Sequence, residues 1–217
     1  PGIALSLAAA DGDERCLAAA RSALRFFEET IGRGAWNGMR VWRLYPEDDK
    51  TIKQGTAVNH ELWAAFFFAA LARAIPGDEA VSRLRQYVDD CVGYAESHTR
   101  PTGDIAYGDY VQELRSAYAS WDAYLLAEIA ERTGSERAMD LSRRITRRLA
   151  EIMLPSGAIP NVTDYREQID GIERWVVHRH GVGPYPIRAD YQLYYVAAAA
   201  LNGSAPEAAL RALVFVL

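Results

Sequence analysis

The stretch NHELWAAFFFAALARAIPGDEAVSRL, from Asn59 to Leu84, contains the unit from which this chain is built. Its first part is almost wholly apolar up to Ala74, as expected of a buried helix. The turn that follows carries Pro76 and Gly77 and then two acids, which suit the end of one helix and the N-cap of the next. The stretch therefore predicts a helical hairpin.

The same kind of short turn recurs along the chain, in AADGDER, AIPGDEA, ERTGSER and LNGSAPE. Helical periodicity dominates between these turns, and no stretch alternates with period two for long. A hairpin repeated at intervals of several tens of residues indicates units that stack and bury their faces on each other. The predicted helices are residues 14–32, 59–75, 78–97, 112–132, 136–153, 190–201 and 205–217. Residues 3–10 resemble the tail of a further helix.

Long connections separate the hairpins, at residues 33–57, 98–111 and 154–189. Two of them echo each other, because RPTGDIAYGDY (Arg100 to Tyr110) and LPSGAIPNVTDY (Leu154 to Tyr165) share Pro-[Thr/Ser]-Gly-x-Ile and end in Asp-Tyr. The order of long loop, helix, short loop and helix predicts an all-α fold, an α/α toroid. In it the helices after the long loops line the interior.

We expect residues 1–217 to form a single α/α-toroid domain. Closed toroids commonly contain six or seven hairpins and this sequence supplies about four, so we expect an incomplete ring and a piece of a longer chain. An open helical-repeat solenoid is the alternative. Solenoids have shorter and more uniform repeats without such long loops, which favours the toroid.

Composition excludes several classes of function. The net charge of -5 and the pI near 5.4 argue against a nucleic-acid partner. No apolar run is long enough for a membrane span, so no membrane partner is expected. Cys16 and Cys91 are isolated and fit no zinc motif, although a disulfide between them stays open. The sequence predicts no cofactor, and it does not indicate an oligomeric state.

The long loops should gather at one end of the ring, around a concave cleft rimmed by aromatic side chains. Such faces suit sugar rings, which predicts a carbohydrate substrate, but they also suit isoprenoid chains. Asn59 and His60 stand at the start of an interior helix at this end. Asn59 could simply be an N-cap. The functional alternative is that both side chains point into the cleft.

Two segments between Asn59 and Glu131 carry a family resemblance. NHELWAAFFFAALARA resembles the Asn-His-x-x-Trp segment that opens an inner helix in α/α-toroid polysaccharide lyases of the alginate-lyase type. TGDIAYGDYVQELRSAYASWDAYLLAEIAE resembles the segment that follows it in those lyases. The resemblance implies that Asn59 and His60 form the catalytic pair, with Tyr118 as the catalytic Tyr and Arg115 as the Arg.

These residue types suit β-elimination or epimerisation of a uronic acid. Removal of the C5 proton requires that the neighbouring carboxylate be neutralised, which Asn59, His60 and Arg115 can do as donors. Tyr118 or His60 can take the proton, and a Tyr can return one to the leaving oxygen. The overall negative charge offers no steering for an anionic polymer.

Carboxylates support a different enzyme on the same fold. Asp104 and Asp109 on one loop, with Asp164 and Asp170 on another, could provide an acid/base pair for glycoside hydrolysis, and Glu61 is a further candidate. A terpenoid-cyclase-like toroid and a noncatalytic helical scaffold remain open as well.

A second candidate region runs from Trp175 to Val196, WVVHRHGVGPYPIRADYQLYYV. His178 and His180 lack a third ligand at suitable spacing, so we expect no metal site. Arg188 and Tyr191 occupy the place in their helix that Arg115 and Tyr118 occupy in theirs. The substrate-binding residues predicted are Trp63, Asp104, Tyr107, Asp109, Tyr110, Asp164, Tyr165, His178, His180, Arg188 and Tyr191.

Overall fold

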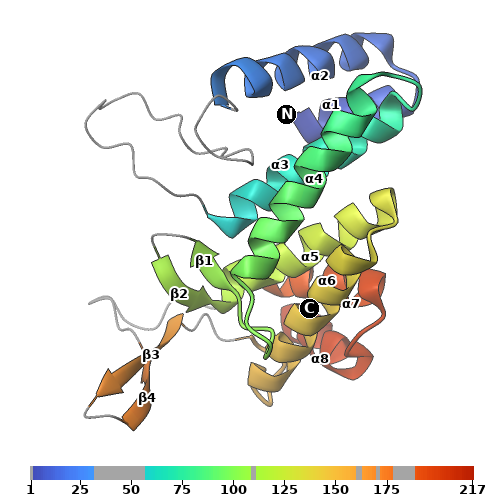
Figure 1. The fold of residues 1–217 in the computed structure, drawn as a ribbon. Coiled ribbons are helices and arrows are strands. Elements are labelled where there is room, and N and C mark those ends of the chain that lie inside the picture. The colour runs from blue at the N-terminus through green and yellow to red at the C-terminus, as the bar shows by residue number, and fades with distance from the viewer. Residues whose placement is uncertain (1, 32–56, 109–110, 160–162, 170–171, 178–188) are drawn as a thin grey trace.

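The computed structural model describes residues 2–31, 57–108, 111–159, 163–169, 172–177 and 189–217, and most of these residues are helical (Figure 1). The helices form four successive hairpins within the described residues, as the repeated turns predicted. These are α1 (Gly2–Ala10) with α2 (Glu14–Phe26), α3 (Val58–Ala74) with α4 (Ala80–Ser97), α5 (Ser116–Thr133) with α6 (Glu136–Ile152), and α7 (Ala189–Asn202) with α8 (Pro206–Val216). A π-helical segment, η1 (Phe27–Ile31), extends α2.

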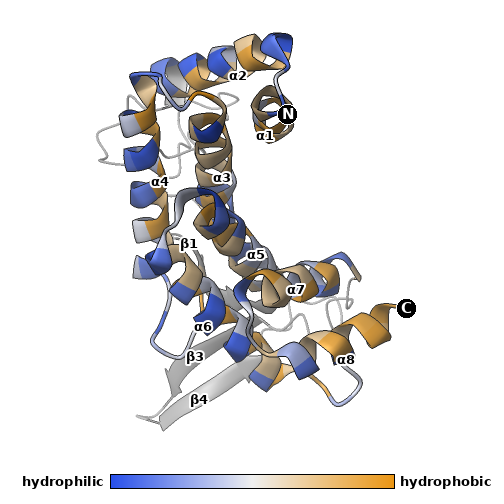
Figure 2. Cartoon of the chain, turned by 90° about the vertical axis from the view of Figure 1, so that its right-hand side faces the viewer, coloured by the Kyte–Doolittle hydropathy of each residue, from blue (hydrophilic) through white to orange (hydrophobic). Residues whose placement is uncertain are grey.

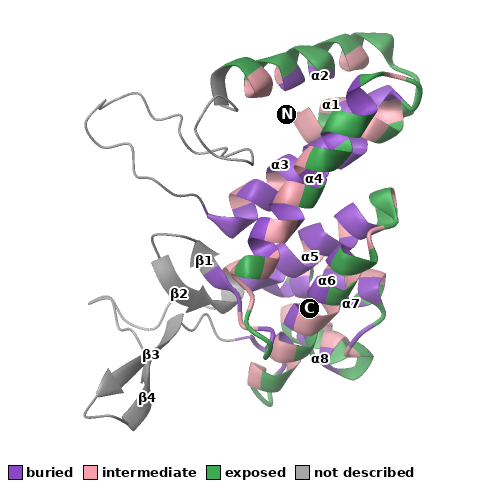
Figure 3. Cartoon of the chain, viewed as in Figure 1, coloured by how far each residue is buried: buried purple, intermediate pink, exposed green. Residues whose placement is uncertain are grey.

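The helices are arranged in an inner and an outer row. Helices α1, α3, α5 and α7 pack against each other in succession, and each is covered by its own hairpin partner. Most of α3 is buried, whereas α2 is exposed along its outer face (Figure 3). The two ends of the row, α1 and α7, lie far apart in both Figure 1 and Figure 2, so these helices form an open arc. The predicted α/α-toroid arrangement is confirmed.

The apolar pattern explains which helix faces inward. Helix α6 is charged on one side and buries Leu141, Ile145 and Leu149 on the other, at spacings of four residues. Figure 2 colours both hydrophilic and hydrophobic residues along the outer helices, whereas α3 consists largely of apolar residues. An amphipathic helix suits the outer row and an apolar helix suits the interior, because only the interior helix is covered on several sides.

The long connections contain a small antiparallel sheet that the sequence analysis did not predict. Its strands are β1 (Ala106–Gly108), β2 (Val111–Arg115), β3 (Thr163–Ile169) and β4 (Ile172–Val177), paired in that order. The sheet lies at one end of the helices, opposite the short turns (Figure 1). Strand β2 runs directly into α5, so the predicted helix start at residue 112 was wrong.

The repeated Pro-[Thr/Ser]-Gly-x-Ile motif forms the same turn twice. The Gly103 amide donates to the Arg100 carbonyl and the Gly157 amide donates to the Leu154 carbonyl, each at 2.9 Å. Both glycines have φ near +90°, at +91° and +90°. A Cβ on Gly103 would lie 2.5 Å from the Arg144 carbonyl oxygen of α6. The motif therefore marks where each connection lies against the backbone of an outer helix.

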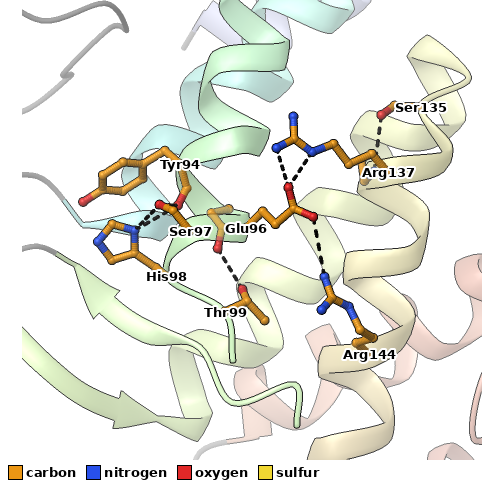
Figure 4. Close-up of polar contacts among 10 residues, drawn as sticks. Tyr94, Glu96, Ser97, His98, Thr99, Ser135, Arg137 and Arg144 are labelled. Atoms are coloured by element: carbon orange, nitrogen blue, oxygen red, sulfur yellow. Dashed lines mark hydrogen bonds and ion pairs between the residues drawn. The ribbon is translucent and has the colours of Figure 1, made fainter. Parts of the chain in front are cut away.

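Polar contacts join neighbouring hairpins. The Arg137 Nε of α6 donates to Glu96 of α4 at 2.7 Å, and Arg144 lies 3.9 Å from the same carboxylate (Figure 4). These side chains are exposed, so the ion pairs contribute at most about 1 kcal/mol. A buried contact is stronger, because Asn202 donates to Ser142 at 2.8 Å and to Thr146 at 2.9 Å.

The two cysteines are free thiols, which settles the question of a disulfide between them. Burial and the nearby Glu61 carboxylate raise the pKa of the Cys91 thiol well above its ordinary value. None of the helices in the described residues combines the length and the apolar character that a membrane crossing requires.

Candidate functional site

The candidate site lies where the inner helices begin. The first turns of α3, α5 and α7 all point toward the end of the arc that carries the sheet (Figure 1). Because α3 packs on α5 and α5 packs on α7, side chains from these turns lie on adjoining helices. Helix N-termini carry partial positive charge, which favours a carboxylate or another anion near them.

Asn59 lies within the first turn of α3 and does not cap it. The N-cap is Ala57, and no side chain caps the helix. The hypothesis that Asn59 serves simply as the N-cap of this helix is therefore wrong. Its side chain is 2 % exposed, and its Oδ1 has no hydrogen-bond partner among the described residues. A buried amide oxygen without a partner costs about 1–3 kcal/mol, and such groups in folded proteins commonly mark functional positions.

His60, the next residue, is half-buried. Burial lowers its pKa to about 4. The imidazole is therefore neutral at physiological pH, with one ring nitrogen able to accept a proton or a hydrogen bond.

Glu61 contacts the outer row. Its side chain is fully buried, and its Oε2 accepts a hydrogen bond from the Cys91 Sγ of α4 at 3.5 Å. This contact holds the carboxyl between α3 and α4. The carboxyl thus takes part in packing within the hairpin, which does not suit the acid role considered from sequence.

Aromatic rings from α5 and α7 form a continuous layer. The ring of Tyr118 lies 5.4 Å from Trp121 and 6.2 Å from Tyr191, and Trp121 lies 5.6 Å from Tyr194. Tyr124 extends the layer by contacting Tyr194 at 5.4 Å. The structure therefore brings the predicted Tyr118 and Tyr191 together through Trp121, which sequence reasoning did not select.

The repeated tyrosines differ in exposure. Tyr191 is 7 % exposed, whereas Tyr118 is only half-buried. Of the two, Tyr118 is the ring with more surface left for a ligand. The two tyrosines thus occupy equivalent backbone positions in α5 and α7, but they differ in exposure.

Trp63 is half-buried on α3 and stacks on Phe66, with ring centroids 6.4 Å apart. The Arg132 guanidinium covers the Phe66 ring at 4.6 Å. Trp63 is thus held by packing along its own helix, and it retains partial exposure for contact with a ligand.

Asp122 is the functional candidate that the sequence analysis missed. It lies in the second turn of α5, is 2 % exposed, and its Oδ1 has no hydrogen-bond partner among the described residues. Burial raises its pKa well above the ordinary value. The side chain therefore favours the neutral carboxylic acid, which can donate a proton. The signal was the polar residues Ser120 and Asp122 within the apolar segment ASWDAYLLA.

Asp104 is placed differently from the prediction. Its carboxylate accepts from the Arg148 Nε of outer helix α6 at 2.7 Å and from the Thr102 hydroxyl at 2.7 Å. The side chain therefore anchors the repeated turn to the outer row. The role of substrate ligand at the inner helices does not fit this position.

The strands bring other predicted residues into register. Arg115 pairs with Thr163 and Leu114 with Asp164, while Tyr165 pairs with Val176. Tyr107 lies in β1. Two long connections thus meet next to the start of α5. Asp109, Tyr110, Asp170, His178, His180 and Arg188 lie outside the described residues.

Among the described residues, no group of three or more His, Cys, Asp or Glu side chains is placed to hold a metal ion. The first two turns of the inner helices carry a buried amide, a neutral imidazole, a phenol and a buried carboxyl.

Comparison with solved structures decides the fold. A crystal structure of a possible member of the GH105 family from Klebsiella pneumoniae subsp. pneumoniae MGH 78578 matches 99 % of this chain with a TM-score of 0.69 and 14 % sequence identity. The chain has the α/α-toroid fold. It spans 57 % of the Klebsiella chain.

No family model matches this chain, and no curated protein matches it. At 14 % identity the similarity to the Klebsiella structure concerns the fold. That structure is described as a possible GH105 protein, so the resemblance to alginate-lyase-type enzymes rests on the sequence motifs alone.

Proposed function

We propose that this toroid is a carbohydrate-active enzyme that removes the proton next to the carboxylate of a uronate unit, as a lyase or an epimerase. One observation carries the proposal: His60, held neutral by burial, and Tyr118 stand in the first turns of two inner helices that pack on each other. A base and a phenol on adjoining helix N-termini suit proton transfer on a bound sugar.

The carboxylate of the substrate would lie near the helix N-termini. Asn59 has an amide and lies in the first turn of α3, and Arg115, the last residue of β2, directly precedes α5 in the chain. Donors of this kind, together with the helix dipoles, stabilise the negative charge that develops when C5 loses its proton. His60 is neutral and can accept that proton, and Tyr118 can protonate the leaving oxygen.

Aromatic rings supply the sugar-binding face. Trp63, Trp121 and Tyr194 are half-buried on α3, α5 and α7, so part of each ring is exposed. The apolar C–H faces of a sugar stack on such rings, and Tyr118 would contact the unit that reacts.

Glycoside hydrolysis on the same toroid is the second candidate, and Asp122 favours it. The buried carboxyl has a raised pKa, as a general acid requires. The Klebsiella protein of similar fold is described as a possible GH105 member. In this alternative Asp122 protonates the glycosidic oxygen, and His60 and Tyr118 bind the sugar.

The two reactions are separated by their products. The full-length protein would be incubated with alginate, polygalacturonate and hyaluronan, and with unsaturated oligosaccharides made from them. A lyase creates an unsaturated uronate and raises ultraviolet absorbance, whereas hydrolysis of an unsaturated unit lowers it. An epimerase leaves the ultraviolet absorbance unchanged, but it incorporates solvent deuterium at C5.

Substitutions then assign the roles. His60→Ala and Tyr118→Phe should each lower turnover at least ~100-fold, because general acid–base groups contribute that much or more. Thermal melting should change little. His98→Ala, at the C-cap of outer helix α4, is the matched control and should keep full activity. Full turnover in both site variants would rule out proton abstraction, and loss confined to Asp122→Asn would establish the hydrolase.

A further inference from the structure

A pocket lies at the opposite end of the helices from the candidate site. It is a cavity of about 230 Å³ between the α3–α4 turn and the end of α5. Three arginines line it, Arg73, Arg85 and Arg132, together with the apolar residues Ala69, Ala72 and Val88. We propose that this pocket binds a tetrahedral oxyanion, a phosphate or sulfate group carried free or on a small molecule.

The charge of the pocket supports an anionic ligand. Arg132 is paired with Glu128 of its own helix and stacks on Phe66. Arg73 and Arg85 have no carboxylate within ion-pair distance among the described residues, and no acidic residue lines the cavity. Two exposed arginines without a carboxylate partner among the described residues thus line the same cavity, and an anion bound there would reduce the repulsion between their charges.

Arg73 and Arg85 are exposed side chains, and their positions in the helices differ. Arg73 and Arg132 lie in the last turns of α3 and α5, where a positive charge also complements the helix dipole. Arg85 gains no such interaction with the helix dipole, because it lies in the second turn of α4. Arg83 of the same helix is paired with Glu28 at 2.5 Å, so of the two arginines only Arg85 lacks a carboxylate partner among the described residues.

The geometry favours a tetrahedral anion over a carboxylate. The three arginines that line the cavity come from three different helices, α3, α4 and α5. A phosphate or sulfate presents oxygens in several directions, whereas a carboxylate presents two in one plane. Guanidinium groups bind phosphate with two parallel hydrogen bonds each, so several can share one tetrahedral group.

This site is independent of the proposed catalytic function. Fourteen residues separate Asn59 from Arg73 on α3, roughly 20 Å at the rise of an α-helix. The apolar wall of Ala69, Ala72 and Val88 gives room for a small organic group attached to the anion.

Binding is tested by calorimetric titration of the full-length protein with inorganic phosphate, inorganic sulfate and acetate at constant ionic strength. Phosphate and sulfate should bind and acetate should not. Arg73→Gln and Arg85→Gln should each weaken phosphate binding about tenfold, the effect of losing a charge-assisted contact. Arg25→Gln, an exposed arginine of α2 outside the pocket, is the matched control and should bind as the parent does.

Glucose 1-phosphate is the additional probe. Tighter binding than that of inorganic phosphate identifies a phosphate ester as the ligand, and equal binding identifies the free anion. The proposal is overturned if neither phosphate nor sulfate binds, if acetate binds as well as they do, or if both pocket variants retain the parent affinity. Circular dichroism of each variant confirms that it is folded.

Discussion

The ring of Tyr118 lies 6.2 Å from the ring of Tyr191, and both rings contact Trp121. Each tyrosine is the third residue of its inner helix and follows an arginine by three positions. Equivalent positions of two repeats therefore meet in the interior. Only Tyr118 keeps substantial exposure, so one of two similar tyrosines is available to a substrate.

Ring packing and chemistry at Tyr118 can be separated. Tyr118→Phe keeps the ring against Trp121 and Tyr191, so the free energy of unfolding should fall by no more than about 1 kcal/mol. Tyr118→Ala removes the ring and should cost about 2 kcal/mol or more. Both should lose activity if the hydroxyl reacts. Urea unfolding and turnover of the two variants check this, and an active Phe variant would leave the ring with a packing role alone.

His60 should make stability depend on pH below neutrality. Its folded pKa is about 4 and its ordinary value is 6.5, so between these values the unfolded chain binds more protons. Stability should therefore fall as pH drops from about 6.5 to about 4, and His60→Gln should flatten that slope. Urea unfolding across this range gives the slope. An imidazole NMR signal that disappears in His60→Gln and titrates near 6.5 in the parent would contradict the prediction.

Asp122 should make stability fall as pH rises, which is opposite to the effect of His60. Burial raises its folded pKa, so the folded protein keeps a proton that the unfolded chain releases above about 3.8. The free energy of unfolding should therefore lose a contribution as pH rises from 4 toward 7. Asp122→Asn should be more stable than the parent at pH 7, with the difference shrinking at pH 4.

Unfolding curves at several pH values test Asp122→Asn against Asp89→Asn, an exposed acid of α4. The difference between Asp89→Asn and the parent should stay small throughout. Parallel curves for Asp122→Asn and the parent would mean that the buried carboxyl keeps an ordinary pKa.

The two motif glycines should tolerate no side chain. Gly103→Ala and Gly157→Ala place a Cβ 2.5 Å and 2.2 Å from carbonyl oxygens of outer helices, at positive φ. Each should cost about 3 kcal/mol or more. Gly134→Ala also has positive φ but meets no atom within 4 Å, so it should cost only about 1–2 kcal/mol. Thermal unfolding compares the three, and equal losses would show that backbone conformation alone requires glycine.

The sequence predicted the helices and their pairing because both depend on local signals. Asp13 and Ser135 cap α2 and α6 through side-chain hydrogen bonds, and Gly12 and Gly134 supply the positive φ of their turns. These preferences act over a few residues, and repetition then indicates stacking. The strands were missed because they are short and do not alternate with period two for long, and the pairing of β2 with β3 joins two separate connections.

At the candidate site the sequence indicated which residue types could react or bind. The tertiary structure decided their burial and their partners. Asn59 and His60 were found because they interrupt an apolar helix. The burial of Asp122, the ion pair of Asp104 with Arg148 and the bond between Glu61 and Cys91 depend on which helices pack together. Loss of water and the approach of a partner from a distant segment set the charge and direction of a side chain, and no local pattern encodes either.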